Sequence, residues 1–393
     1  MKQHSARIGS IDLLRGLVMA LMALDHTRDF FHSNIGGHDP LDLDFTTPAH
    51  FMTRWITHYC APVFVFLAGM SAYLSGLKRS KADLSRFLIT RGLWLVVVEI
   101  TVVTFGWTFN PAYPVLLLQV IWAIGISMVA LGIAVQLPYK YILVIAIIII
   151  AGHNLLDYPE ASHTGSFSFI WDVLHHGRFS FFPYLEGHNL VVVYPVIPWI
   201  GIILIGYCFG KLYEPDFDVS ERKKILLYSG LGMICFFIIL RLLNSYGNPF
   251  HWETQKSVLF TLFSFVDVCK YPPSLLFTCL TIGPALVFLA FSENIKSRLS
   301  QVLTVFGKVP FFYYILHIYI IHIGAVILFY ASGYTSADIG GASALFLFKP
   351  NGMGFNLVGV YLIWLLLLVI LYYPCKWFAG YKSRHEKAWL SYL

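Results

Sequence analysis

Long apolar runs separated by short polar segments dominate this 393-residue chain. Most runs have the length, roughly 20 residues, that an α-helix needs to cross the hydrocarbon core of a bilayer. The pattern predicts an all-α polytopic membrane protein, a bundle of about ten transmembrane helices forming a single domain over residues 1–393. The expected spans lie near 11–30, 55–77, 87–109, 116–137, 139–156, 191–212, 223–243, 272–291, 308–331 and 356–377.

Basic residues between the apolar runs predict how this bundle is oriented. Lysine and arginine crowd two short loops, at 77–91 and 212–223. Because cytoplasmic loops carry the excess of positive charge, both loops are expected on the cytoplasmic side. The N-terminus and the C-terminus are then cytoplasmic as well. The first run carries candidate functional residues, so we interpret it as a retained anchor and not as a cleaved signal peptide.

Composition narrows the function classes. Hydrophobic residues make up 58% of the chain and charged residues 12%, which is too little polar surface for a soluble fold. The net charge of +6 follows the loops and does not predict a nucleic-acid partner. The six cysteines lie mostly within apolar runs and form no metal-type pair, so we predict no disulfide framework and no metal.

The first apolar run, at 11–30, carries the strongest candidate chemistry. Arg15 and His26 are eleven residues apart, which places both on one helix face, ~17 Å apart along the axis. Met19 and Met22 lie between them on that face. Ionisable groups within a spanning helix are costly and by default mark a site. The alternative is structural: the arginine reaches the headgroups and the histidine ends the helix.

Several strings resemble known membrane acyltransferases. An isoleucine-aspartate start, then an arginine followed after ten residues by a histidine, resembles acyltransferase family 3; these residues lie in the run IDLLRGLVMALMALDHTRDFF from Ile11. Together with ITHYCAPVFVFLAG at 56–69 and KYPPSLLF at 270–277, it is more specifically similar to bacterial proteins grouped with the catalytic domain of heparan-α-glucosaminide N-acetyltransferase. The resemblance implies a multi-pass protein of the bacterial inner membrane that moves an acetyl group from cytosolic acetyl-CoA. The acceptor is expected to be a hydroxyl or amine of an extracytoplasmic carbohydrate, and a homodimer is compatible with this group.

This activity gives each residue of the first run an expected role. Acyl transfer needs a base, and imidazole titrates near neutral pH, so His26 is the predicted base or acetyl carrier. Asp25 is a candidate for orienting a histidine. Arg15 is predicted to hold the CoA phosphates, with the pantetheine arm along Met19 and Met22. His58, on the next span, is expected at the depth of His26 and is a second catalytic candidate.

Four further residues are predicted to bind the acceptor, namely His38, His50, Lys270 and His317. The family also leaves the identity of the base open. In the heparan enzyme the position matching His26 resembles an asparagine, and its proposed catalytic histidine lies further along the first lumenal segment. In this chain that segment holds His38 and His50.

Two other functions stay open at this point. Glu99 and His317 near mid-membrane, with proline-broken spans, also suit a proton-coupled transporter of a small or sugar-like solute. A transporter of that kind shows two related halves, and no internal duplication is evident. A catalytically silent lipid- or sugar-binding protein would keep the fold without pairing Arg15 and His26. A contact between Glu99 and Arg15 is a further hypothesis.

Overall fold

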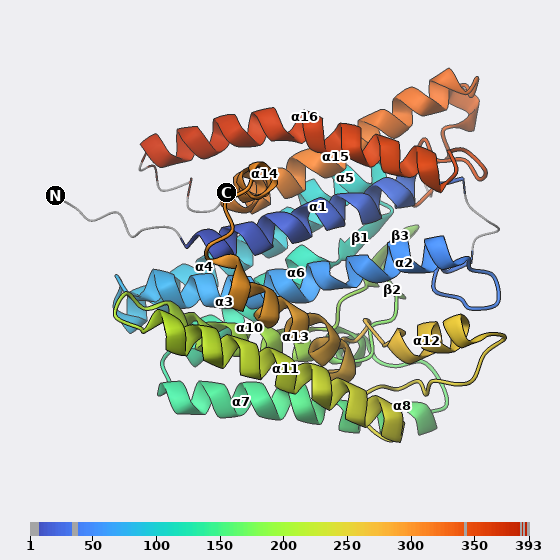
Figure 1. Ribbon diagram of the computed structural model, residues 1–393. Helices are drawn as coiled ribbons and strands as arrows, with labels where there is room; N and C mark the ends of the chain where they lie inside the picture. The colour runs from blue at the N-terminus through green and yellow to red at the C-terminus, as the bar shows by residue number, and fades with distance from the viewer. Residues whose placement is uncertain (1–7, 34–37, 342–343, 386, 388–389, 391–393) are drawn as a thin grey trace.

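The computed structural model describes residues 8–33, 38–341, 344–385, 387 and 390, and it is built mainly from helices that run roughly along one direction (Figure 1). The helices are α1 (Gly9–Phe31), α2 (Pro48–Ile56), α3 (Cys60–Gly76), α4 (Lys81–Val98), α5 (Thr104–Thr108), α6 (Val120–Ala134), α7 (Tyr139–Gly152), α8 (Asp157–Ser162), α9 (Phe169–Leu174), α10 (Val196–Gly210), α11 (Val219–Leu243), α12 (Val258–Val266), α13 (Leu275–Ser292), α14 (Arg298–Lys308), α15 (Pro310–Ala331) and α16 (Leu357–Arg384). Short 3₁₀ or π turns join or extend several of them: η1 (Thr57–Tyr59), η2 (Glu99–Val103), η3 (His153–Leu156), η4 (Lys211–Tyr213) and η5 (Ser336–Asp338).

Eight helical stretches among the described residues are long and apolar enough to cross a membrane. They coincide with eight of the expected spans, so the chain is a multi-pass integral membrane protein. The other two expected spans correspond to α1 and α6. Helix α1 carries several charged residues, and α6 has only 15 residues. The predicted count of ten spans is therefore not confirmed, although α1 and α6 are both helical.

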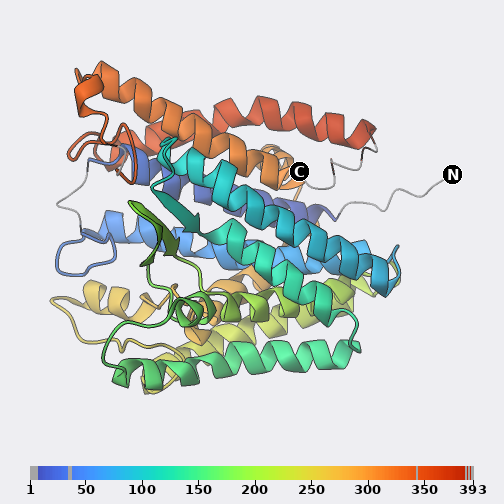
Figure 2. The same ribbon diagram turned by 180° about the vertical axis from the view of Figure 1, so that it is seen from behind.

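The connections between the helices lie at the two ends of the bundle. In both views the α3–α4 and α10–α11 connections, which hold the basic loops, lie at the end where α1 begins (Figures 1 and 2). Helices α2, α8 and α12 and the small sheet gather toward the opposite end. The placement of the basic loops at one end agrees with the positive-inside pattern. The cytoplasmic location of the two termini remains a prediction.

A small sheet interrupts the helical architecture, which the prediction of an all-α fold missed. Strands β1 (Val115–Leu118), β3 (His188–Val192) and β2 (Ser180–Leu185) lie in that order. β1 pairs with β3 in parallel, and β2 pairs with β3 antiparallel. Strand β1 is only four residues long and lies within an apolar run, so its sequence cannot be distinguished from a helical one by periodicity.

Glu99 stabilises the junction between η2, the sheet and α6. Its two carboxylate oxygens accept hydrogen bonds from the backbone N–H groups of Gln119 and Trp122, at 3.3 and 3.1 Å. These donors lie at the start of α6, where backbone N–H groups lack partners within the helix. The carboxylate therefore caps α6. The hypothesised Glu99–Arg15 pair does not match these contacts, because the Arg15 guanidinium bonds Asp12, Ser71 and the Gly307 carbonyl instead.

Helix α1 lies in the interior of the bundle, in contact with α3, α14, α15 and α16. Its closest neighbour is α14, where Gly16 and Gly307 let the two backbones meet. A Cβ atom on Gly16 would lie 1.8 Å from the carbonyl oxygen of Leu303, and one on Gly307 would lie 1.8 Å from that of Asp12. Small residues at such crossings are typical of packed membrane helices.

Candidate functional site

A cavity of about 620 Å³ lies beside the C-terminal half of α1, at the end of the bundle that holds the sheet. Helix α1, the loop after it, α2 and α3 supply much of its wall. Trp107 and two lysines, Lys270 and Lys349, complete the wall from distant parts of the chain. Six of the predicted site residues line it: Met22, Asp25, His26, His38, His50 and Lys270.

His26 and His317 form a hydrogen-bonded pair at the wall of this cavity. His26 Nδ1 lies 2.7 Å from His317 Nε2, and the two rings are stacked with centroids 5.0 Å apart. The edge of the Trp107 indole packs against the His26 ring at 4.7 Å. His26 is partly exposed to the cavity, whereas His317 is fully buried behind it. The structure therefore places His317 next to the predicted base.

The backbone of α15 determines which nitrogen of each ring carries a proton. His317 Nδ1 faces the carbonyl oxygens of Tyr313 and Tyr314, at 3.2 and 2.5 Å. A carbonyl only accepts, so His317 Nδ1 is the donor, and in the neutral ring Nε2 is an acceptor. His26 Nδ1–H then donates to it. The remaining nitrogen of His26, Nε2, is left with a free lone pair in a residue that lines the cavity.

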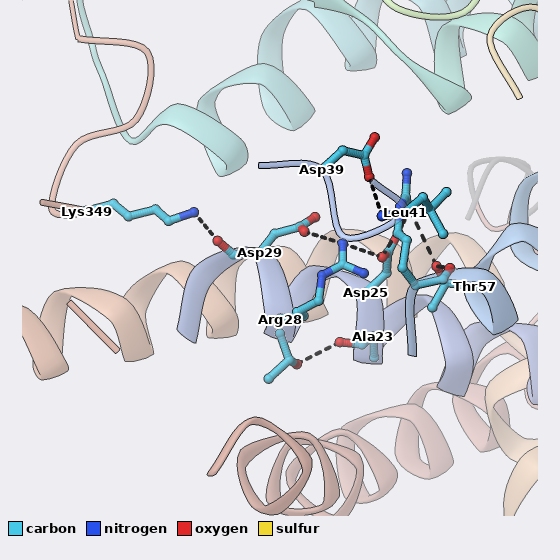
Figure 3. A network of polar contacts seen from close by, with 10 residues as sticks. Ala23, Asp25, Arg28, Asp29, Asp39, Leu41, Thr57 and Lys349 are labelled. Atoms are coloured by element: carbon cyan, nitrogen blue, oxygen red, sulfur yellow. Dashed lines mark hydrogen bonds and ion pairs between the residues drawn. The ribbon is translucent and has the colours of Figure 1, made fainter. Parts of the chain in front are cut away.

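Asp25 belongs to an ionic network, shown in Figure 3, and not to a histidine. Its carboxylate pairs with Arg28 and with Arg54, each at 2.8 Å. Arg28 also pairs with Asp29 at 2.6 Å, and Lys349 donates to the backbone carbonyl of Asp29 (Figure 3). The expected role of Asp25 in orienting a histidine is not supported. Asp25 points about 100° away from His26 on the helix, toward the two guanidinium groups.

Cationic side chains surround the cavity. Lys270 is only 8% exposed, and its Nζ lies 5.1 Å from the centre of the Tyr271 ring. Burial by itself raises the pKa of Tyr271, but Lys270 and Arg54 outweigh burial, so that the pKa of this phenol is lowered. Burial also lowers the pKa of the Lys349 ammonium. The cavity therefore offers positive charge in a site partly shielded from water, where electrostatic attraction is stronger.

Three histidines lie toward the loop side of the cavity. His50 Nε2 lies 2.9 Å from His32 Nε2, and its Nδ1 lies 2.7 Å from the hydroxyl oxygen of Thr47. His38 is exposed and stacks on Phe45 with ring centroids 3.7 Å apart. Burial, together with neighbouring His50 and Arg28, lowers the pKa of His32. His38 and His50 thus line the same cavity as His26. Their binding of the acceptor stays a prediction.

Arg15 lies outside this cavity, in the packed half of α1. Its guanidinium bonds Asp12 at 3.0 Å, the Ser71 hydroxyl at 2.8 Å and the Gly307 carbonyl at 3.1 Å. Met19, one turn along, is 1% exposed. Neither residue lines the cavity. Met22, further along the same face, does line the cavity. The binding of acetyl-CoA by Arg15 and Met19 stays a prediction.

His58 is also outside the cavity. It lies in η1, where the helix changes from α2 to α3, and is 2% exposed. Its ring packs near that of Phe277, with centroids 5.5 Å apart. His58 therefore packs toward Phe277 of α13 and does not line the cavity that His26 borders. Its role as a second catalytic candidate stays a prediction.

Sequence reasoning missed four residues that shape the site, namely Arg28, Arg54, Trp107 and Lys349. The three-residue spacing of Asp25 and Arg28 on one helix was a usable signal for their ion pair. Nothing comparable marked Lys349. It reaches the cavity from the loop between α15 and α16, far from α1 in sequence.

Comparison with known proteins gives one family. The family model described as "Heparan-alpha-glucosaminide N-acetyltransferase, catalytic" matches residues 7–239, more than half of the chain. The match covers α1, the histidine-bearing loop, α2 and α3, and therefore includes His26 and the Asp25–Arg28–Arg54 ion pairs, whereas Lys349 and His317 lie outside it. A search of curated proteins gave no match.

Proposed function

Because the chain belongs to the heparan-alpha-glucosaminide N-acetyltransferase catalytic family, we propose that it transfers an acetyl group from acetyl-CoA to an extracytoplasmic acceptor. The acceptor is a hydroxyl or amine of a sugar-like molecule, and the protein works in the inner membrane of a bacterium. The family supports a membrane acetyltransferase. The observation that carries the mechanism is the His26–His317 pair at the cavity wall.

His26 acts as the general base. Its Nε2 takes the proton of the acceptor hydroxyl or amine as the acceptor oxygen or nitrogen attacks the thioester carbonyl carbon. The tetrahedral intermediate then collapses, the carbon–sulfur bond breaks and CoA leaves as a thiolate. The imidazolium returns its proton to that thiolate, which restores neutral His26 and releases the CoA thiol.

His317 is a positioning residue in this scheme. Its Nε2 accepts the Nδ1–H of His26, holds the ring in one tautomer and stabilises the imidazolium that forms during transfer. The carbonyl groups of Tyr313 and Tyr314 hold His317 in turn. This chain of hydrogen bonds performs the task that we first assigned to Asp25.

The cations around the cavity bind the reactants. Lys270 and Lys349 provide positive charge for the oxyanion of the intermediate or for anionic groups of the two substrates. Asp25 keeps Arg28 and Arg54 in place. His38 and His50, nearer the loop side, contact the acceptor. The proton-coupled transporter that the sequence left open has no comparable support, because the family points to group transfer.

The proposal is tested with the purified protein in lipid nanodiscs, supplied with acetyl-CoA and a panel of amino sugars and neutral sugars. We expect release of the CoA thiol that depends on one class of acceptor, with the acetyl group recovered on that acceptor. His26→Gln should abolish this turnover while acetyl-CoA still binds, since only the chemical step is lost. The matched control is His58→Gln, a buried histidine outside the cavity, which should keep its activity.

Two results would contradict the proposal. Thiol release that is absent with every acceptor, in a protein that binds acetyl-CoA, would remove the transferase activity. Activity that survives His26→Gln but is lost in His38→Ala or His50→Ala would move the base into the loop, as in the heparan enzyme.

A further inference from the structure

A second polar cluster lies away from the acetyl-transfer cavity, where α8 is followed by α9. Asp157 and Glu160 are three residues apart on α8, so both carboxylates lie on one face of the helix. His175 directly follows α9. One possible ligand atom from each of these three residues lies within 4.8 Å of the other two. Glu160 is 8% exposed and His175 is fully buried.

Each carboxylate of this cluster has one oxygen held and one oxygen free. Asn154 Nδ2 donates to Asp157 Oδ2 at 2.6 Å, and Trp171 Nε1 donates to Glu160 Oε1 at 2.9 Å. Asp157 Oδ1 and Glu160 Oε2 are buried and have no hydrogen-bond donor among the described residues. Buried carboxylate oxygens without a donor are costly. A bound cation removes that cost.

The histidines of the cluster are arranged as a metal ligand with a supporting partner. His175 Nδ1 lies 2.8 Å from Glu160 Oε1, on the side of the carboxylates. His175 Nε2 lies 3.1 Å from His153 Nδ1. Because a carboxylate oxygen only accepts, His175 Nδ1–H donates to Glu160 Oε1 in this structure. On binding an ion His175 takes its other tautomer, in which Nε2–H donates to His153 Nδ1 and the Nδ1 lone pair faces the ion. Metal-binding histidines are commonly oriented in this way by a hydrogen bond from the other ring nitrogen.

From this arrangement we propose that Asp157, Glu160 and His175 bind one divalent transition-metal ion of the zinc or manganese class. One nitrogen and two oxygen ligands suit such ions better than calcium, which prefers oxygen ligands alone. Ligand atoms bonded to one such ion at roughly 2.0–2.2 Å lie no more than ~4.4 Å apart. The observed cluster reaches that geometry through small side-chain shifts.

A neighbouring cavity of about 210 Å³, lined by Asp157 and Glu160, has room for the water molecules that complete the coordination. The ion joins α8 to the segment that leads into the sheet. It takes no part in the acetyl-transfer scheme above. We predicted no metal from the sequence because its cysteines form no metal-type pair. In this cluster the histidine lies 15 residues from the nearer carboxylate.

The test measures metal content and needs no activity assay. The full-length protein, purified without a histidine tag, is stripped with a chelator, dialysed against Zn²⁺ or Mn²⁺ and then against metal-free buffer. We expect about one ion per chain by elemental mass spectrometry. Glu160→Gln and His175→Ala should lose it, and Asp157→Asn serves if either variant fails to fold. His176→Ala is the matched control, because its ring bonds Asp172 at 2.6 Å outside the cluster.

Thermal unfolding gives a second reading of the same site. The metal should raise the unfolding temperature of the wild type and of His176→Ala, because it binds the folded state, and should not raise that of Glu160→Gln. A wild type that retains neither ion, or variants that retain as much as the wild type, would overturn the proposal. The cluster would then be held by the hydrogen bond between His175 Nδ1 and Glu160 Oε1. Neither result bears on acetyl transfer, so the two proposals fail separately.

Discussion

The two halves of helix α1 carry polar side chains on one face and use them in opposite ways. In the first half, Arg15 is bonded to Asp12, Ser71 and the Gly307 carbonyl, in a region where α14 packs directly on the helix. In the second half, His26 borders a cavity and is hydrogen-bonded to His317.

The difference between these halves lies in the neighbouring helices. Close packing against α14 largely buries Arg15, whose charge stabilises the structure by satisfying nearby oxygens. His26 instead lines the cavity, and its Nε2 has no hydrogen-bond partner among the described residues. Shared position on a helix face therefore does not imply a shared function. Substitutions in the first half should alter stability, and substitutions in the second half should alter chemistry.

After the abolished turnover of His26→Gln, the largest effect is expected from His317→Ala. Removing the acceptor of the His26 Nδ1–H bond leaves the base without its oriented tautomer, so kcat should fall by about 10²-fold. The KM for acetyl-CoA should stay unchanged, since His317 does not line the cavity. His322→Ala is the matched control, because this buried histidine of α15 bonds the Gly106 and Leu347 carbonyls instead. An equal loss of kcat in both variants would show that His317 contributes only to packing.

The next effect is expected at the packed half, from Gly16→Ala. The new Cβ would lie 1.8 Å from the Leu303 carbonyl oxygen, so α1 and α14 must separate. Overpacking of this kind costs about 1–3 kcal/mol of unfolding free energy. Gly9→Ala, on the same helix, has no heavy atom within 4 Å of its Cβ and should be neutral. The two variants are compared by thermal unfolding in detergent, and equal stability would contradict the packing argument.

Arg15→Met should also act through stability. It leaves the Asp12 carboxylate and the Gly307 carbonyl without this donor, which costs about 1–3 kcal/mol. The affinity for acetyl-CoA, measured by calorimetry, should not change. Weaker acetyl-CoA binding in a variant of unchanged stability would restore the original expectation that Arg15 holds the donor phosphates.

The smallest effect concerns Lys349 and pH. Burial lowers the pKa of its ammonium, so the charge is lost at a lower pH than that of an ordinary lysine. If this charge binds the reactants, the KM should rise on the alkaline side as the ammonium deprotonates. Lys349→Arg, which stays protonated throughout, should move that rise to higher pH. Identical KM profiles for the two proteins would show that the Lys349 charge does not contribute to binding.

Much of this protein follows from local sequence alone. The eight long apolar helices were predictable because a bilayer demands about 20 apolar residues per span, whatever those residues later contact. His26 was also identified from local sequence, since burying an ionisable group in an apolar run costs free energy and therefore marks a candidate site. The strings around it also indicated the family before any geometry was known.

The tertiary structure decided which of these residues work together. Arg15 and His26 share a helix face, but only the packing of α14 shows that one is enclosed and the other faces a cavity. The partner of His26 comes from residue 317, and Lys349 comes from a loop still further along. Helical periodicity determines which way a side chain points, whereas the helix that lies opposite is determined by packing between segments distant in sequence. For that reason the local sequence indicated His26 as a functional residue, whereas its partners in the site are determined by the tertiary structure.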